Sequence, residues 1–134
     1  MRKSLMTAML ILACTGCGSA YFYHPTPEAY NRSISHWIGF GAAELYADWG
    51  YPQATQSIDD NTYLETYYKL NRNTKIRPVN QTAGYYRPFN ERWDTIISQY
   101  KTQPMPENYN CRTSFIIVNG VIVDYSYKGY GCVE

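Results

Sequence analysis

Three features that many enzymes and nucleic-acid-binding proteins share are scarce or missing in this chain of 134 residues. Its two histidines, His24 and His36, have no neighbouring cysteine or carboxylate at the spacing of a zinc site. A formal net charge of +1 argues against a dedicated nucleic-acid binder. Neither a Gly-rich phosphate loop nor a Gly-x-Ser-x-Gly motif is present. We therefore expect a protein that is not an enzyme and that uses no cofactor, metal or nucleic acid.

The apolar run near the N-terminus, Leu5–Leu12, is too short to span a bilayer as a helix, which needs about 20 residues. It follows Arg2 and Lys3, so the pattern predicts a secretory signal peptide. The next residues, Ala-Cys-Thr-Gly-Cys-Gly-Ser at 13–19, place small side chains before cysteines and resemble a bacterial lipobox.

Two cysteines compete for the role of lipid anchor. Cys14 has Ile11 three positions before it, which fits the lipobox better than the Cys14 that precedes Cys17. The number of cysteines left after cleavage nevertheless favours Cys17. If Cys17 is acylated, Cys14 leaves with a signal peptide of residues 1–16, and Cys111 and Cys132 remain to pair in an oxidising compartment. If Cys14 is the anchor, Cys17 stays as an odd thiol. A cleaved signal without a lipid is the third interpretation.

The segment after the anchor reads as a tether. Residues 17–32 carry Pro25 and Pro27 and show no sustained hydrophobic period, so we expect the folded domain to span 33–134. In the resembled lipoproteins, an Asp directly after the anchor retains the protein in the inner membrane. Gly18 stands there instead, which implies an outer-membrane protein that faces the periplasm.

One short helix is punctuated at both ends. Gly41 stands at a plausible N-cap of residues 42–49, Gly50 follows at a position that favours a left-handed residue, and Pro52 cannot continue the helix. Its apolar residues recur at helical spacing, so this helix needs a sheet to cover, and either Trp37 or Ile38 is expected to pack back on it. The apolar stripe consists of Ala42, Leu45, Tyr46 and Trp49.

After Pro52 the chain predicts strands. Gln53–Ser57 is a weak candidate, residues 59–61 (Asp-Asp-Asn) form a turn signal, and Thr62–Leu70 is a stronger strand, rich in Thr and Tyr. Of its two faces, we expect the one with the aliphatic residues to be the inner face. That face carries Leu64, Thr66, Tyr68 and Leu70.

The C-terminal region predicts a β-hairpin. Arg112–Val118 and Val121–Lys128 flank Asn119-Gly120, and Asn-Gly favours the tight turn in which both central residues have positive φ. A regular register then sets Val118 opposite Val121, Ile116 opposite Val123, and Ser114 opposite Tyr125. It also places Asp124 on the same face as Phe115, Ile117 and Ile122.

The same register sets Cys111 opposite Lys128. Cys132 is four residues further on, and Gly129 and Gly131 allow the chain to fold back to Cys111. A disulfide would close a loop of 22 residues. In the chain-entropy model this is worth about 3 kcal/mol.

Residues 71–110 form an insert with four prolines, at 78, 88, 104 and 106, so no strand is expected to run through it. Asn90 could cap a second helix there, because apolar residues repeat at i, i+3, i+4 and i+7 after it. These residues are Trp93, Ile96, Ile97 and Tyr100.

Basic and aromatic residues interleave in and before this insert. Six basic residues and one acidic residue lie between Lys69 and Arg92. Charge and aromatic faces together suit an acidic partner, lipid phosphates or a glycan strand. The alternative is a solvated loop that balances the acidic region from Glu44 to Glu65. The candidate binding residues are Arg77, Tyr85, Tyr86 and Arg87.

The motif Trp37-Ile-Gly, then Glu44-Leu45, then Trp49-Gly-Tyr-Pro52, followed by an acidic turn and Leu64-Glu-x-Tyr-Tyr68, resembles the SmpA/OmlA type of small bacterial lipoprotein. This type is related in fold to BamE, a lipoprotein of the outer-membrane β-barrel assembly machine. The resemblance implies an α+β domain with one or two short helices on a three- to four-stranded antiparallel sheet. It covers 37–68 and the hairpin from 115 to 125.

The C-terminal cysteine pair and the long insert depart from BamE and resemble uncharacterised envelope lipoproteins. The implied function is a lipid-anchored, non-enzymatic protein-interaction module with an envelope partner, in outer-membrane or secretion complex assembly. The alternative is a glycan- or lipopolysaccharide-binding module that uses the basic, tyrosine-rich insert.

Overall fold

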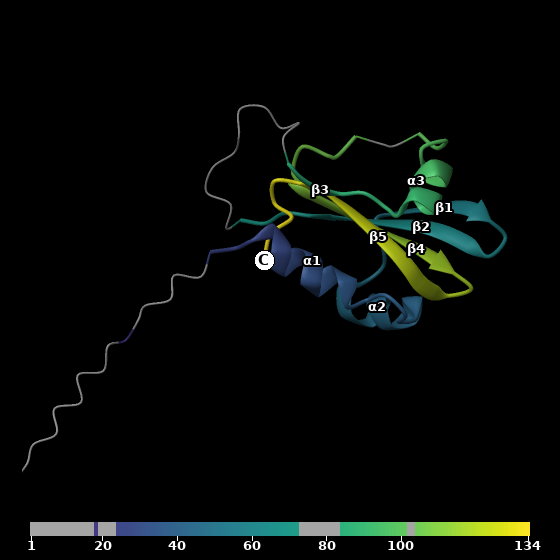
Figure 1. The fold of residues 1–134 in the computed structure, drawn as a ribbon, viewed down its shortest axis with the longest axis horizontal. Coiled ribbons are helices and arrows are strands. Elements are labelled where there is room, and N and C mark those ends of the chain that lie inside the picture. Colours follow the sequence, from purple (N-terminus) through teal and green to yellow (C-terminus); the bar gives the residue numbers. More distant parts are fainter. Residues whose placement is uncertain (1–17, 19–23, 73–83, 102–103) are drawn as a thin grey trace, which may run out of the picture.

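A computed structural model describes residue 18 and residues 24–72, 84–101 and 104–134. The described residues form an α+β domain in which an antiparallel sheet carries helices on both faces (Figure 1). The predicted class is therefore confirmed, although the sheet has five strands, in the order β1-β2-β4-β5-β3, rather than three or four. The elements are α1 (Pro27–Ser35), α2 (Ala42–Trp49), β1 (Ala54–Asp59), β2 (Thr62–Lys69), β3 (Tyr85–Arg87), α3 (Glu91–Ile97), β4 (Cys111–Val118) and β5 (Val121–Gly129).

The central helix α2 has the predicted bounds. Gly41 caps it in an extended conformation, and its N–H donates to the Glu44 Oε2 at 2.8 Å. Gly50 ends the helix with φ of +81°, which a residue without a Cβ adopts at little cost. Leu45 is fully buried, and the Trp49 ring packs edge-on against Phe115 at a centroid distance of 5.5 Å. The predicted stripe therefore anchors α2 to the sheet.

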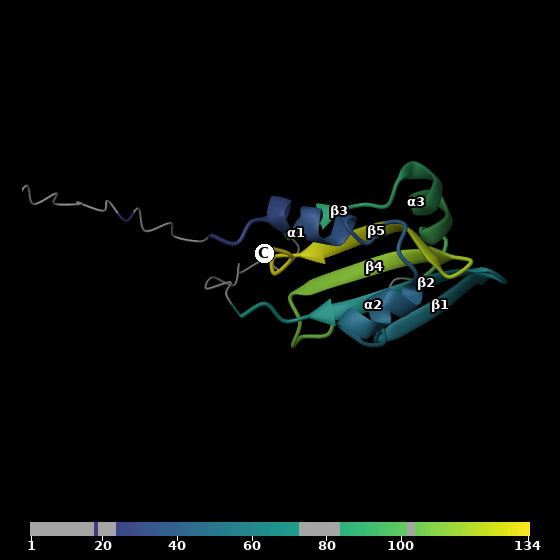
Figure 2. The ribbon, with the colours of Figure 1, turned by 90° about the horizontal axis from the view of Figure 1, so that it is seen from below.

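Helix α1 corrects the expectation that residues 17–32 are a tether. Thr26 caps the helix, because its side chain accepts from the Ala29 N–H at 3.1 Å, and Pro27 occupies the first turn. Tyr30 and Ile34 lie one turn apart and are both buried. The folded domain thus includes residues 27–32. α1 and α2 lie together on one face of the sheet (Figure 2).

Strand β2 is present as predicted, but its inner face was assigned wrongly. The residues packed beneath α2 are Glu65 and Tyr67, which are 5% and 3% exposed. The Tyr67 ring meets Trp49 edge-on at 5.2 Å, and its hydroxyl donates to the Gly50 carbonyl at 2.8 Å. Tyrosine serves here as a core residue because its polar end has a partner. The face with Leu64, Thr66 and Tyr68 points to the α3 side, and Leu70 is 50% exposed.

The hairpin turn is confirmed, with φ of 52° at Asn119 and 77° at Gly120. Its predicted register holds only near the turn, where Val118 faces Val121. The register then shifts by one residue, and Val123 is the extra residue of a β-bulge. Beyond the bulge the observed pairs are Ile116 with Asp124, Ser114 with Ser126, and Arg112 with Lys128. The predicted pairs Ile116–Val123, Ser114–Tyr125 and Cys111–Lys128 are therefore wrong.

The bulge exchanges the faces of all later residues in β5. Ile122 remains in the core between the sheet and α1/α2, but Asp124 moves from that face to the α3 side. Tyr125 and Tyr127 take its place in the core, 4% and 7% exposed. The Tyr30 ring packs edge-on against Tyr127 at 5.3 Å.

The described part of the insert holds one element that the sequence excluded and one that it predicted. β3 is a strand of three residues, between Gly84 and Pro88, that pairs with β5 at the edge of the sheet. An edge strand of this length fits beside the prolines without losing ladder hydrogen bonds. α3 begins after Asn90 as predicted, and the Asn90 side chain accepts from the Trp93 N–H at 3.2 Å.

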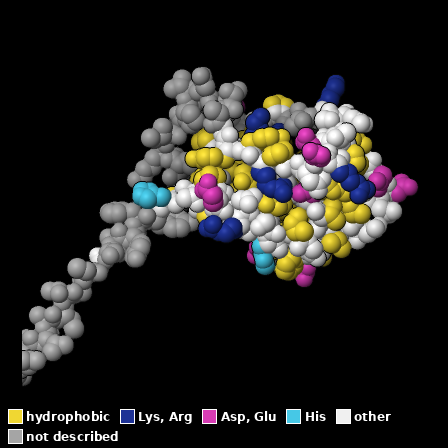
Figure 3. Space-filling view, viewed as in Figure 1, with side chains coloured by type: hydrophobic (Ala, Val, Ile, Leu, Met, Phe, Trp, Pro, Cys, Tyr) yellow, Lys and Arg dark blue, Asp and Glu magenta, His cyan; other side chains and the backbone are white. Residues whose placement is uncertain are grey.

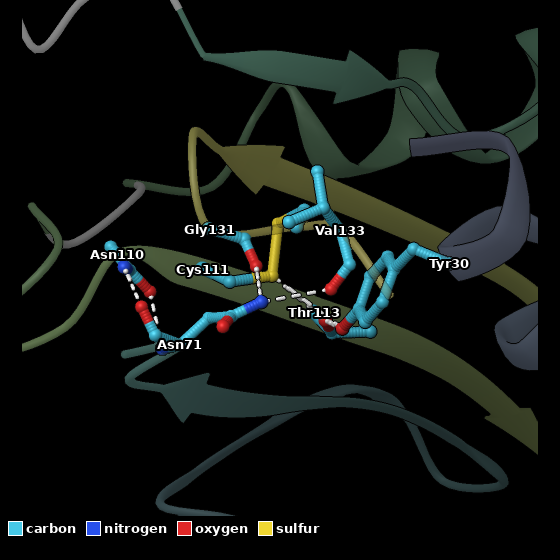
Figure 4. Close-up of a disulfide and its surroundings, with 8 residues drawn as sticks. Tyr30, Asn71, Asn110, Cys111, Thr113, Gly131 and Val133 are labelled. Carbon is cyan, nitrogen blue, oxygen red and sulfur yellow. Dashed lines mark hydrogen bonds between the residues drawn. A yellow bond between two sulfur atoms is a disulfide. The ribbon is translucent and has the colours of Figure 1, made fainter. Parts of the chain in front are cut away.

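A disulfide joins Cys111 to Cys132, as predicted, with an S–S distance of 2.06 Å. Both cysteines are buried, and the bond holds the C-terminal segment against the start of β4 (Figure 4). Nearby, Asn71 and Asn110 exchange hydrogen bonds at 2.8 and 2.9 Å. The Glu134 backbone pairs with that of Thr26, so the C-terminal segment also holds the start of α1.

Candidate functional site: the groove beneath helix α3

The four residues predicted to bind a ligand do not form one cluster in the described part of the chain. Arg77 lies outside the described residues, as do Cys14 and Cys17. Tyr85 and Tyr86 are exposed on β3, at 45% and 58%. Neighbouring residues of a strand point to opposite faces, and only Tyr86 lines a cavity on the α3 side. In the view of Figure 3, basic side chains are scattered among apolar and acidic ones.

Arg87 is a structural residue rather than an open ligand-binding cation. Its guanidinium donates to the Tyr125 carbonyl and lies over the Tyr125 ring, 3.7 Å from the centroid. One guanidinium nitrogen is 3.4 Å from the Asp124 Oδ1, and this is the only ion pair among the described residues. These contacts hold β3 on β5. They also neutralise the positive charge of Arg87, for which the sequence analysis predicts a role in ligand binding.

Asp124 connects the bulged strand to α3. Its side chain is 5% exposed, and Oδ2 accepts from the Asn90 backbone N–H at 2.8 Å, directly before the helix. At the other end of the helical region, the Tyr100 hydroxyl donates to the Ile58 carbonyl of β1 at 3.3 Å. The α3 segment is therefore fastened to the sheet at both ends, although no residue within α3 is buried.

Between these two attachments lies a hollow of about 430 Å³, which we call the α3 groove. Strands β1, β2, β4 and β5 supply its floor, and Tyr86, Ile97 and Tyr100 supply walls. Part of the floor carries hydroxyl groups: Thr66 Oγ1 and Ser114 Oγ lie 3.0 Å apart, and Ser126 is next to them on β5. Lys101 and Arg112 add positive charge, and Asp94 adds one negative charge. The groove suits a ligand with hydrogen-bonding groups and some apolar surface.

Sequence reasoning found one groove residue, Tyr86, and missed most of the others. The sequence correctly places Leu64, Thr66 and Tyr68 on one face of a strand, but that face lines the α3 groove and not the core beneath α1 and α2. Ser114 and Ser126 meet across the groove floor only because of the bulge at Val123, and single-sequence patterns carry no signal for that shift.

The groove crosses the α3 face of the sheet and reaches the open edge of the sheet at β1. Within the described residues β1 pairs with β2 alone, so its outer edge has no neighbouring strand. Ala54, Thr55 and Gln56 of this strand also line the groove. The backbone N–H and C=O groups at the outer edge of β1 therefore lie next to the α3 groove, where one ligand can contact both.

The remaining chemistry of the described residues gives no metal site, since no group of three or more potential metal ligands gathers there. One buried carboxyl stands out. Glu65 accepts a hydrogen bond from the Tyr46 hydroxyl, but its Oε2 is buried without a partner. Burial raises the pKa of the Glu65 carboxyl, and the Tyr46 hydrogen bond opposes that rise. None of the described helices is both long and apolar enough to cross a membrane.

No protein-family model matches the chain, and comparisons with curated proteins and with solved structures give no significant match. The resemblance to SmpA/OmlA lipoproteins therefore stays a prediction from sequence motifs.

Proposed function

We propose that this chain is a lipid-anchored, non-enzymatic binding module of a bacterial cell envelope, and that it holds an extended segment of a partner protein. The observation that carries the proposal is the α3 groove beside the open edge of β1. An extended peptide that pairs with an edge strand gains backbone hydrogen bonds, and its alternate side chains enter any adjacent groove. Here the edge strand and the groove share residues 54–56.

The composition of β1 supports this role. Natural proteins protect open edges with proline, lysine or very short strands. β1 has six residues, Ala-Thr-Gln-Ser-Ile-Asp, with neither proline nor lysine and with a single charge at its end. The pairing of β1 with β2 is irregular only between Ser57 and Asp59, at the C-terminal end of β1. An edge left open over this length is a suitable template for a partner strand.

The envelope location rests on the predicted signal peptide and lipobox, and the disulfide is compatible with an oxidising compartment. Cys17→Ser is expected to abolish lipid labelling in cells, whereas Cys14→Ser should leave it intact. Labelling that persists in Cys17→Ser and disappears in Cys14→Ser would assign the anchor to Cys14. Loss in neither variant would contradict acylation at this motif.

Photo-crosslinking tests the partner-binding role. A photoreactive residue at Gln56 or Tyr86 is expected to capture one protein in intact cells, since both positions line the groove. The same residue at Tyr51, which is 83% exposed and packs beside Tyr46 of α2, is the control for unspecific capture. Equal adduct patterns from all three positions, or none from Gln56 and Tyr86, would contradict the proposal.

A second candidate is a glycan or lipopolysaccharide ligand, favoured by the hydroxyl-bearing floor and by the exposed ring of Tyr86. Aromatic faces combined with hydroxyl and cationic groups suit sugar rings and their phosphates. In this case purified lipopolysaccharide or glycan strands should bind the chain, and Tyr86→Ala and Lys101→Met should each weaken that binding. Unchanged binding in both variants would exclude the groove as the glycan site.

A further inference from the structure

A second hollow lies on the opposite face of the sheet, where α1 and the end of α2 meet the end of β2 and the C-terminal segment. Its volume is about 900 Å³. Tyr30, Ile34, Trp37 and Trp49 give it apolar and aromatic walls, and Lys69 projects into it from the end of β2. We call it the Lys69 cavity.

The ammonium group of Lys69 lies 3.2 Å from the centroid of the Trp49 ring. Among the described residues no carboxylate oxygen comes within 4.0 Å of it, since Arg87–Asp124 is the only ion pair there. No described residue accepts a hydrogen bond from it either. Burial lowers the pKa of Lys69 to about 8, against the opposing effect of the carboxylates of Glu134 and Asp48. Lys69 is thus a half-buried cation whose one close partner among the described residues is the Trp49 ring.

Charged side chains of both signs line the cavity. Lys69 and Arg72 supply two cations, and Asp48 and Glu134 supply two carboxylates. The two carboxylates would repel a polyanion, and the Lys69 ammonium would repel a simple cation. A ligand with one positive and one negative group can pair with the carboxylates and with the cations of the cavity at the same time.

We propose that the Lys69 cavity binds a short zwitterionic peptide, with its carboxylate at the Lys69 ammonium and its amino group toward Asp48 and Glu134. A carboxylate replaces the hydrogen-bond acceptors that Lys69 lacks, and charge-assisted hydrogen bonds are stronger than neutral ones. The apolar part of the peptide packs against Trp37 and Ile34. This site lies on another face from the α3 groove, so it does not depend on the function proposed above.

Tryptophan fluorescence measures this binding directly. The chain has three tryptophans, and in a Trp93→Phe background only Trp37 and Trp49 remain, both in the cavity wall. Titration of the folded chain with the tripeptide Ala-Ala-Ala is expected to give a saturable change with a Kd below about 1 mM. Its C-terminal amide and its N-acetyl derivative, which each lack one charge, are expected to bind at least about 10-fold more weakly.

Lys69→Met removes the ammonium but keeps a flexible apolar stem over Trp49, and it should lower the affinity for Ala-Ala-Ala at least about 10-fold. Lys69→Arg keeps a cation and should retain binding. Lys128→Met is the matched control and should bind like the parent, because Lys128 is exposed on β5 and lines neither the Lys69 cavity nor the α3 groove. Circular dichroism confirms that each variant is folded before titration.

Three results would overturn the proposal. The first is no saturable change up to about 10 mM tripeptide. The second is equal affinity for the free tripeptide and for either capped form, because this would remove the argument for a zwitterion. The third is equal binding by Lys69→Met and Lys128→Met. Should Lys69→Met fail to fold, Lys69→Arg and the capped peptides still decide the outcome.

Discussion

Replacing Asp124 by alanine tests the attachment on which the α3 groove depends. The Asp124 side chain is 5% exposed, and its carboxylate accepts from the Asn90 N–H at 2.8 Å and from the Arg87 guanidinium at 3.4 Å. Alanine removes both interactions at once. It leaves the backbone N–H before α3 without its acceptor and the guanidinium without its counter-charge.

The size of the effect follows from the two contacts. A hydrogen bond to a buried charged group contributes about 1.5–3 kcal/mol, so the bond from Asn90 is the larger part. The contact with Arg87 adds at most about 1 kcal/mol, because the Arg87 side chain is 32% exposed and its charge is partly screened. Asp124→Ala should therefore lower the free energy of unfolding by about 3 kcal/mol, which corresponds to a Tm lower by about 10 °C.

Urea unfolding at neutral pH measures this difference for Asp124→Ala, Asp124→Asn and the parent. Asparagine keeps an acceptor oxygen for Asn90 but loses the charge, so its cost should be about half that of alanine. Combining Asp124→Ala with Arg87→Met should give a coupling energy of about 1 kcal/mol. In Asp124→Ala, amide hydrogen exchange should become faster in residues 91–97 by a larger factor than in β4.

Asp60→Ala is the matched control, because Asp60 is an exposed turn residue and its replacement should change stability by less than about 0.5 kcal/mol. A loss in Asp124→Ala no larger than in Asp60→Ala would refute the reasoning. Unchanged exchange in residues 91–97 would separately show that Asp124 does not hold α3.

Three further predictions concern the other side of the sheet and the C-terminal segment. The folded state raises the pKa of Glu65, so this carboxyl contributes stability at low pH that is lost as pH rises. Glu65→Gln should therefore gain stability relative to the parent in urea unfolding as pH rises above the usual glutamate pKa of about 4.3, and a difference that does not change with pH would contradict this. Replacing both cysteines of the Cys111–Cys132 disulfide by serine should cost about 3 kcal/mol in the same assay, and a cost below about 1 kcal/mol would be inconsistent with the entropic estimate. Gly129 has φ of +141°, and an added Cβ would lie 2.1 Å from the Asn110 carbonyl oxygen, so Gly129→Ala should lower the Tm far more than Gly18→Ala, where no atom lies within 4 Å.

Local signals in the sequence predicted those elements whose ends are marked by residues with one dominant conformational role. Gly41, Gly50 and Pro52 define α2, Asn90 defines the start of α3, and Asn119-Gly120 defines the hairpin turn. Each acts within a few residues of its own position. These local conformational preferences do not depend on contacts with distant parts of the chain.

The start of α1 carried a signal of the same kind that was overlooked. Thr26 followed by Pro27 and Glu28 is a cap, a first-turn proline and a first-turn acid, and Tyr30 and Ile34 follow at helical spacing. The prolines at 25 and 27 are equally typical of a tether, which is the structure predicted above. Proline is compatible with the first turn of a helix, so its presence alone did not decide between the two.

Contacts between distant segments were beyond such signals. The inner face of β2 depended on whether one or both faces of the sheet are covered, and helices cover both. The candidate site was affected most. Arg87 was predicted to bind a ligand from its charge, but its partners Asp124 and Tyr125 are nearly forty residues away in the chain.

The bulge at Val123 connects these errors, because one extra residue in β5 determines the chemistry of both faces. In a regular hairpin Asp124 would point into the core beside Phe115, as a buried carboxylate with no partner predicted for it, and Tyr125 would face α3. The bulge reverses this arrangement. It places Asp124 where Asn90 and Arg87 satisfy it, and it places Tyr127 beneath α1, where it packs on Tyr30. The α3 groove and the wall of the Lys69 cavity therefore both depend on the same irregularity, and deleting Val123 should disturb both sites together.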